Sequence, residues 1–429
     1  MLSDLEPRFI ENNTIPQDLY KTFDVKRGLR NADGSGVLSG LTRISSVIGS
    51  KKIDGKLEPV EGALKYRDIP LADVIKKCQE KKGPLFETVT YLLLVGEMPS
   101  DQDLKLFCDA LYKERELPED IIEHCILGIK SKNIMNKIQT CISALYANDS
   151  NPDSIDPFEN FFKAISIIAK IPTIVAYSYL SAYKHVETFT VPDAGMSISQ
   201  GFLSMLNQGE KPSEMDSEML DLMLLLHAEH GGGNNSTFTT YVVTSSQADI
   251  YSALAAAVGS LKGPLHGSAN KKVVDMMEYV KRKVETWDNP EDVRNCLQRL
   301  LAKEAYDRSG KIYGLGHAVY TKSDPRAEVL KEKAIEMATQ KNRIDELNLY
   351  FSIEKEGPSL FSSFKGSDKV ISPNVDFFSG FVYDCLDIPR EIFTPLFAMA
   401  RSAGWCSHRI EELLSGKRII RPGYKYVGD

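Results

Sequence analysis

Three of the seven histidines of this chain lie in glycine-rich turns: His230 in HGGGNNS, His266 in GPLHGSAN and His317 in GLGHAVY. A glycine beside a histidine lets the backbone approach a ligand and lets the imidazole leave a helix surface. One such histidine alone is most often a capping or core residue. Three such turns in one chain favour a site in which imidazoles meet a ligand.

Two arginines are candidate anion binders. Arg326 follows Asp324-Pro325, a pair that predicts the start of a helix, so its charge lies in a first turn where the helix dipole does not favour it. Arg326 therefore either meets an anion or is simply solvated. Arg401 lies on an aromatic and small-residue helical face, where it either reaches the surface or pairs with a carboxylate in a pocket.

Two further candidates stand beside apolar or glycine-rich residues. Asp376, in PNVDFFSG, is either a general base with a raised pKa or a helix cap. Asn234 and the backbone of GGGNNS offer hydrogen-bond donors to an anionic oxygen, although the segment lacks the G-K-[ST] of a P-loop.

Other chemistries find little support. His227 and His230 share a helical face, but H-E-x-x-H is absent, so no metal site is predicted. GLGHAVY lacks the third glycine of a dinucleotide fingerprint and follows a poor strand. No G-x-S-x-G occurs, and the only cysteine near a candidate histidine, Cys406, lies in a helix. The remaining His, Asp and Arg residues suit proton transfer and carboxylate binding without a covalent intermediate or a cofactor.

The elements that must position these residues are mainly helical. Apolar residues recur at helical spacing over 85–96, 218–230 and 250–261. The best strand candidate is TFTTYVVTS at 237–245, which runs into an Ala-rich helix. The sequence therefore predicts an all-α fold.

A segment rich in Lys and Glu predicts a second domain. Residues 276–379 read as amphipathic helices and are flanked by turn-rich stretches. We expect them to form a smaller helical domain, inserted into a large helical domain made of residues 1–275 and 380–429. The junctions would form an active-site cleft.

The bulk composition sets further expectations. The chain has 52 Lys and Arg against 59 Asp and Glu, a net charge of -7, which argues against a nucleic-acid partner. Its seven cysteines are scattered and never form C-x-x-C, so neither structural zinc nor a disulfide framework is expected. The apolar stretch 161–183 contains two lysines and a proline, which favours a buried core helix over a membrane span. With no targeting signal in its first residues, the chain is expected to be cytoplasmic.

Several segments taken together resemble the citrate synthase family. They are HAEHGGGNNSTF, GPLHGSANKKV, GLGHAVYTKSDPRAEVL, PNVDFFSGFVYDCLDIP, FAMARSAGWCSHRIEE and RIIRP, which occur in the order and rough spacing of that family. The resemblance covers nearly the whole chain from about residue 35. It implies a two-domain helical fold and a homodimeric acyltransferase of the tricarboxylic acid cycle, which joins acetyl-CoA to oxaloacetate.

The resemblance also implies residue roles. His266 would hydrogen-bond the thioester oxygen of acetyl-CoA, Asp376 would remove the methyl proton, and His317 would polarise the ketone of oxaloacetate. The residues that would bind oxaloacetate or citrate are His230, Asn234, Arg326, Arg401 and, in the neighbouring subunit's site, Arg421. Those that would contact CoA are Gly314, Leu315, Gly316 and Lys369.

Two alternatives remain open from the sequence. A 2-methylcitrate synthase would use propionyl-CoA, and one methylene in an apolar pocket is worth only about 1–3 kcal/mol, so short motifs do not separate the two enzymes. A non-catalytic paralogue that senses oxaloacetate or CoA belongs to a different functional class, and the presence of all three catalytic candidates argues against it.

Overall fold

The computed structural model describes residues 2–366 and 370–428 and is 60% helical, which confirms the predicted all-α class. The first helices are α1 (Glu6–Asn13), α2 (Gln17–Thr22), α3 (Leu71–Glu80), α4 (Leu85–Val95), α5 (Asp101–Lys113), α6 (Ile134–Leu145), α7 (Pro157–Tyr179), α8 (Ile198–Leu206) and α9 (Glu214–His227). They are followed by α10 (Asn235–Ser245), α11 (Ile250–Lys262), α12 (Ala269–Lys283), α13 (Pro290–Leu301), α14 (Pro325–Gln340), α15 (Ile344–Lys365), α16 (Val375–Cys385) and α17 (Phe393–Ser415). Short 3-10 or π turns lie at Leu2–Leu5, Arg27–Leu29, Ile121–Leu127, Tyr146–Asn148, Leu180–Lys184 and Arg390–Ile392.

Helix α17 is a central helix of the fold and packs against α4, α7, α9, α10 and α11. Nearly every residue from Phe393 to Ile410 is buried, because this helix is surrounded on all sides rather than on one face. Helix α7 passes the length and hydropathy test for a membrane span, but 78% of its most apolar window is buried inside the fold. The expectation of a core helix at 161–183 is confirmed.

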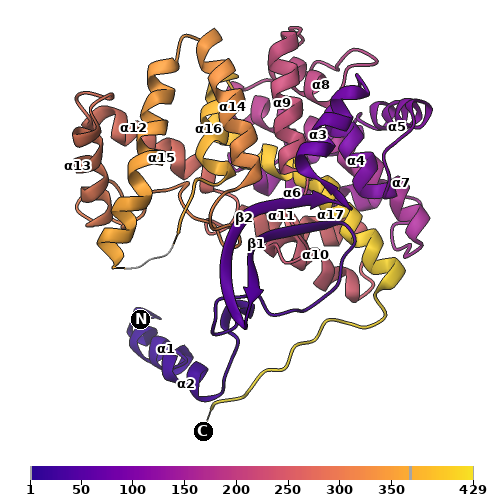
Figure 1. The fold of residues 1–429 in the computed structure, drawn as a ribbon. Helices are drawn as coiled ribbons and strands as arrows, with labels where there is room; N and C mark the ends of the chain where they lie inside the picture. Colours follow the sequence, from indigo (N-terminus) through magenta and orange to yellow (C-terminus); the bar gives the residue numbers. More distant parts are fainter. Residues whose placement is uncertain (1, 367–369, 429) are drawn as a thin grey trace.

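Helices α12 to α16 gather on one side of the molecule, away from α3 to α9 (Figure 1). Among them, α16 contacts α12 and α14, and α15 contacts α13 and α14. Positions 275 and 379, the predicted domain boundaries, both fall inside continuous helices, α12 and α16. The division into 1–275, 276–379 and 380–429 stays a prediction.

The predicted strand at 237–245 is wrong, because this segment is helix α10. Its buried threonines, Thr237, Thr240 and Thr244, recur at helical spacing on the face that packs against α11 and α17. Tertiary packing thus overrides the strand preference of its β-branched residues.

A β-hairpin is present where the sequence reading found no strand. Strands β1 (Ser45–Ile53) and β2 (Lys56–Tyr66) pair antiparallel, and the two-residue β3 (Ile69–Pro70) extends β2. Asp54 and Gly55 both adopt positive φ, 49° and 82°, as a type I′ turn requires. The Asp-Gly pair was the sequence signal for this hairpin, which curves down from the helices so that its turn lies below them in Figure 1.

Candidate active site

His230 lies in a turn just after helix α9 ends. Gly231 takes φ +88°, a conformation that favours glycine, and this bend turns the chain away from the helix axis. The His230 side chain is buried, and its Nε2 has no hydrogen-bond partner within the described residues. Burial lowers the pKa of His230 well below its usual range, and Arg326 adds to this effect. The ring is therefore neutral, with one nitrogen free for a ligand.

His317 faces His230 across the site. Their ring centroids lie 5.2 Å apart, and Tyr320 packs against both rings at 5.3 and 5.0 Å. The Nδ1 of His317 accepts backbone N–H groups from Val319 at 3.0 Å and Tyr320 at 3.1 Å. Burial and Arg326 lower the pKa of His317 to about 4, so the ring is neutral. Because Nδ1 is an acceptor, the single ring proton must lie on Nε2, which makes that atom a hydrogen-bond donor.

Arg326 is buried, which excludes the solvated alternative. Asp324 caps helix α14 by accepting the Arg326 N–H at 3.0 Å, and the same carboxylate takes Nε at 3.0 Å and Nη2 at 2.8 Å from its guanidinium. Its Oδ2 also accepts the Val375 N–H at 3.1 Å, which joins α14 to the start of α16. The anion that Arg326 meets within the chain is therefore Asp324, a partner that sequence reasoning treated only as a cap.

Arg401 is fully buried without a carboxylate partner. Its Nε donates to the carbonyl of His227 at 2.8 Å, and its guanidinium carbon lies 4.7 Å from the centre of the Phe397 ring. Neither Nη1 nor Nη2 has a hydrogen-bond partner among the described residues. Burial lowers the pKa of Arg401 to about 10, with Glu229 opposing the shift, so the group is still charged near neutral pH. A buried cation with two unused donors indicates that an anionic ligand completes the site.

Asp376 occupies the first turn of helix α16. Asn374 is the cap, because its side chain accepts the Asp376 N–H at 3.0 Å, so the cap alternative for Asp376 is wrong. Burial raises the pKa of Asp376 to about 6, while Arg326 and Arg401 act to lower it. A carboxylate with a raised pKa is a stronger base than an ordinary aspartate.

His266 lies in the turn between α11 and α12. Its Nε2 is 3.0 Å from the hydroxyl of Ser236, which also accepts the indole N–H of Trp405 at 3.1 Å and donates to Asn234 Oδ1 at 2.9 Å. Burial lowers the pKa of His266 to about 4, with a smaller effect from Arg401. His266 is therefore a neutral ring oriented by a serine that sequence reasoning missed, although Ser236 stands in the same motif as Asn234.

The charge of Arg401 acts on His230, His266 and Asp376, and that of Arg326 acts on His230, His317 and Asp376. Three histidines and one aspartate from separate turns thus share the electrostatic field of two buried arginines. Tyr320 and Asp324 also belong to this group and were not predicted as site residues. Both lie within the motif GLGHAVYTKSDPR, so the motif was the signal for them.

The predicted CoA loop is held against the segment before α16. The Gly316 N–H donates to Ser372 O at 2.8 Å, and the Asn374 N–H donates to Gly314 O at 2.9 Å. The Leu315 N–H donates to Ile312 O at 3.3 Å. Gly314 and Gly316 have φ of +84° and +86°, so both need glycine. Lys369 lies outside the described residues.

Arg421 is not brought to the other site residues. It lies in the exposed C-terminal segment beyond α17, which runs away from the body toward α2 (Figure 1). The described residues hold no group of three or more His, Cys, Asp or Glu side chains arranged to bind a metal ion. All seven cysteines are buried and unpaired by disulfides.

Comparison with known proteins gives a consistent picture. The family described as citrate synthase, C-terminal domain, matches residues 32–423. Citrate synthase of Haloferax volcanii is 32% identical over 95% of this chain and 96% of its own length. A 2-methylcitrate synthase of Mycobacterium tuberculosis is 34% identical, over 94% and 91% respectively. The ternary complex of Thermoplasma acidophilum citrate synthase with carboxymethyl coenzyme A and oxaloacetate has a TM-score of 0.77 at 25% identity, covering 94% of this chain and 96% of that one.

Proposed function

Because this chain belongs to the citrate synthase family and is a transferase-type enzyme, we propose that it condenses acetyl-CoA with oxaloacetate and water to give citrate and CoA. The observation that carries the proposal is the buried Arg401 guanidinium, whose Nη1 and Nη2 have no partner within the described residues. A guanidinium with two parallel donors matches one carboxylate of oxaloacetate. The structurally similar Thermoplasma enzyme is described in complex with oxaloacetate and a CoA derivative.

In the proposed mechanism, the dicarboxylate binds before the chemistry. Arg401 and Arg326 hold its carboxylates, while His230 and the Nε2–H of His317 contact its oxygens. The tautomer of His317 supports this role, because a donor is required to polarise the ketone as carbon attacks it. Asn234 lies at the end of the turn that carries His230, where its side chain accepts a hydrogen bond from Ser236.

The second half of the mechanism generates the nucleophile. Asp376 removes a proton from the methyl group of acetyl-CoA while His266 donates a hydrogen bond to the thioester oxygen, so that an enol forms. The Ser236 hydroxyl has one hydrogen, and it donates to Asn234 Oδ1, so Nε2 of His266 carries the ring proton in this arrangement. For catalysis we propose that the hydroxyl turns from Asn234 to Nε2, which places the ring proton on Nδ1, where it is available to the substrate. The raised pKa of Asp376 reduces the difference between its pKa and that of the far less acidic methyl group. Attack on the ketone gives citryl-CoA, and its hydrolysis releases citrate and CoA.

The neighbouring subunit is proposed to complete the site. Arg421 lies in the exposed segment after α17, as expected for a residue that acts in a partner chain of a homodimer. The loop 314–316 and Lys369 are proposed to bind CoA.

A second candidate, 2-methylcitrate synthase, is favoured by the relative of that name, which is as similar to this chain as the citrate synthases are. The test is the rate of thiol release with acetyl-CoA and with propionyl-CoA, each with and without oxaloacetate. We expect kcat/KM to be at least about tenfold higher for acetyl-CoA. An equal or reversed preference would assign the chain to 2-methylcitrate synthesis, and no release with either thioester would indicate a non-catalytic paralogue.

A further inference from the structure

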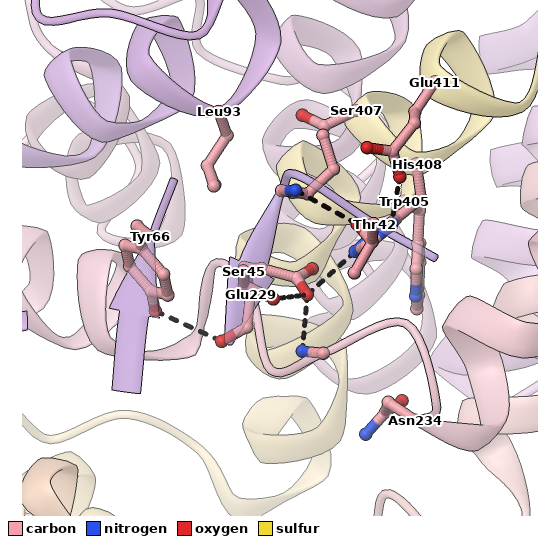
Figure 2. A network of polar contacts seen from close by, with 12 residues as sticks. Thr42, Ser45, Tyr66, Leu93, Glu229, Asn234, Trp405, Ser407, His408 and Glu411 are labelled. Atoms are coloured by element: carbon pink, nitrogen blue, oxygen red, sulfur yellow. Dashed lines mark hydrogen bonds and ion pairs between the residues drawn. The ribbon is translucent and has the colours of Figure 1, made fainter. Parts of the chain in front are cut away.

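A buried carboxylate–imidazole pair lies directly behind the site. Glu229 precedes His230 in the chain, and its Oε1 lies 2.9 Å from Nε2 of His408 on helix α17 (Figure 2). Both side chains have 0% exposure. Neither residue has a role in the proposed mechanism, so the pair requires a reason of its own, because taking two charged groups out of water is costly.

The hydrogen bonds around His408 show that its ring is charged. The hydroxyl of Tyr241 donates its one hydrogen to Glu411 Oε2 at 2.7 Å. Nδ1 of His408 is also 2.7 Å from the Tyr241 oxygen, so in this second hydrogen bond Nδ1 must be the donor and the Tyr241 oxygen the acceptor. The opposite nitrogen, Nε2, faces the carboxylate of Glu229. Both ring nitrogens are therefore donors, which makes His408 an imidazolium and Glu229 its counterion.

Glu229 also holds the turn that carries His230. Its Oε1 accepts the backbone N–H of Gly231 at 2.5 Å and the hydroxyl of Ser45, at the start of strand β1, at 2.8 Å. The other oxygen, Oε2, packs against Gly404 of α17, where a Cβ would lie 2.1 Å from it. The carboxylate is thus enclosed by the His230 turn, the hairpin and α17, and it cannot move without moving them.

The Glu229–His408 pair also links the His230 turn to helix α17, which carries Arg401. His408 follows Arg401 by seven residues on α17, so the two side chains leave the same side of the helix. The guanidinium of Arg401 is held by the carbonyl of His227, which is in the same short stretch as Glu229 and His230. The negative charge of Glu229 also opposes the loss of the Arg401 proton on burial.

From these contacts we infer that Glu229, fixed by His408, is a positioning residue for oxaloacetate: it holds the His230 turn against helix α17 and so sets the distance between His230 and Arg401. This inference rests on the proposed function, since it names the part of the chain that aligns two of its binding groups. It concerns the dicarboxylate half of the site and leaves the thioester half unaffected.

The test compares Glu229→Gln with a matched control. Gln keeps the shape and one acceptor oxygen but removes the charge. We expect KM for oxaloacetate to rise roughly tenfold, with KM for acetyl-CoA and kcat each within about twofold of the wild type. The control is Asp221→Asn, which changes another buried carboxylate in α9 that accepts the N–H groups of Leu85 at 2.6 Å and Phe86 at 3.0 Å, away from the site. We expect this control to leave KM for oxaloacetate unchanged.

A second variant covers the case in which Glu229→Gln does not fold. Tyr241→Phe removes the acceptor of His408 Nδ1 together with the donor to Glu411, and leaves Glu229 in place. We expect a rise in KM for oxaloacetate of about threefold with KM for acetyl-CoA unchanged. An unchanged KM for oxaloacetate in the folded variants, or an equal rise in both KM values, would overturn the inference. Wild-type turnover with oxaloacetate tests the proposed function separately, so the two failures are distinguishable.

Discussion

At the scale of single residues, the site is made of neutral rings held around two buried cations. Arg326 has an internal carboxylate, Asp324, whereas Arg401 has none and leaves two guanidinium nitrogens without partners in the described chain. This difference assigns them different tasks. Arg401 is the group most dependent on a bound anion, since a carboxylate can satisfy both of its remaining donors.

The first prediction concerns Arg401→Lys. Lysine keeps a positive charge but loses the forked donors and the bond from Nε to His227, so we expect KM for oxaloacetate to rise about 100-fold. The matched control is Arg409→Lys on the same helix, where the buried arginine bonds Asn160 at 2.9 Å and Ala248 at 2.9 Å. The control should lower the melting temperature without changing KM for oxaloacetate. Steady-state kinetics and thermal melts of both variants make the comparison, and equal KM values would count against ligand binding by Arg401.

The second prediction follows from the protonation of Asp376. A general base must be ionised, and the pKa of Asp376 is raised to about 6, so activity is full above that pH and is lost as the pH falls through it. His266 and His317, whose pKa values are lowered to about 4, stay neutral across this range and add no second step. A profile of log kcat/KM should therefore fall by one unit for each pH unit below about 6. A flat profile from pH 7 to pH 5 would contradict the assignment of the base.

Glycine turns and isolated charges marked His230, His266, His317, Arg326, Arg401 and Asp376 as candidates, and the resemblance to the citrate synthase family gave each a role. The sequence left their protonation states and hydrogen-bond partners open. The sequence could not reveal that Asn374 rather than Asp376 caps α16, or that Asp324 accepts two hydrogen bonds from the Arg326 guanidinium. Both depend on rotamers and on which backbone N–H groups are free, which only the folded chain decides.

At the scale of elements, the β-hairpin contacts both sets of loops that carry the site. The Thr321 hydroxyl donates to Gly49 O of β1 at 2.5 Å, and the Gly62 N–H of β2 donates to Ser323 Oγ at 3.0 Å. On the other side, Ser45 bonds Glu229 in the His230 turn. The hairpin thus holds the His317 and His230 loops relative to each other.

The third prediction is that Gly49→Ala displaces the His317 loop. A Cβ at this position would lie 2.2 Å from the Val319 carbonyl oxygen and 2.6 Å from the Tyr320 Cα, so backbone must shift. A displacement of about 1 Å at a catalytic group can cost about 100-fold, and we expect kcat/KM to fall by that order. Gly40→Ala is the control, because a Cβ there meets nothing within 4 Å. Activity and melting curves should separate the two, and a fully active Gly49→Ala would show that the hairpin does not position His317.

The element scale also shows where sequence reading failed. The hairpin was missed because few of its residues are buried and they alternate weakly, so that its strong signal was Asp54-Gly55. The false strand at 237–245 had the opposite cause, since its β-branched residues pack at helical spacing against α11 and α17. The helices predicted at 85–96, 218–230 and 250–261 are confirmed as α4, α9 and α11, because their apolar periodicity extends over several turns.

At the scale of the whole molecule, the C-terminal segment after α17 lies apart from the candidate site. The segment after α17 is extended and exposed, and its Lys425 lies over the ring of Phe23 near α2 rather than at the site. Arg421 belongs to this segment. If the enzyme is a homodimer, as proposed, this arm is in a position to leave its own chain and reach another.

The fourth prediction uses mixed subunits. Arg421→Met and Asp376→Asn should each be nearly inactive alone. When the two variants are mixed and allowed to exchange subunits, a heterodimer has one site with Asp376 of one chain and an intact Arg421 of the partner. About a quarter of the wild-type activity should return with equal amounts of the two chains. No recovery after proven subunit exchange would show that Arg421 acts within its own chain.

The proposed mechanism requires Asp376 to remove a proton from a CoA thioester after oxaloacetate binds. The direct measurement is oxaloacetate-dependent thiol release from acetyl-CoA by the wild type and by Asp376→Asn, with oxaloacetate affinity of both measured by calorimetry. If Asp376 is the base, the wild type releases thiol only when oxaloacetate is present, Asp376→Asn loses about 1000-fold or more of this activity, and both proteins bind oxaloacetate with similar affinity. Turnover by Asp376→Asn within tenfold of the wild type would contradict this role of Asp376.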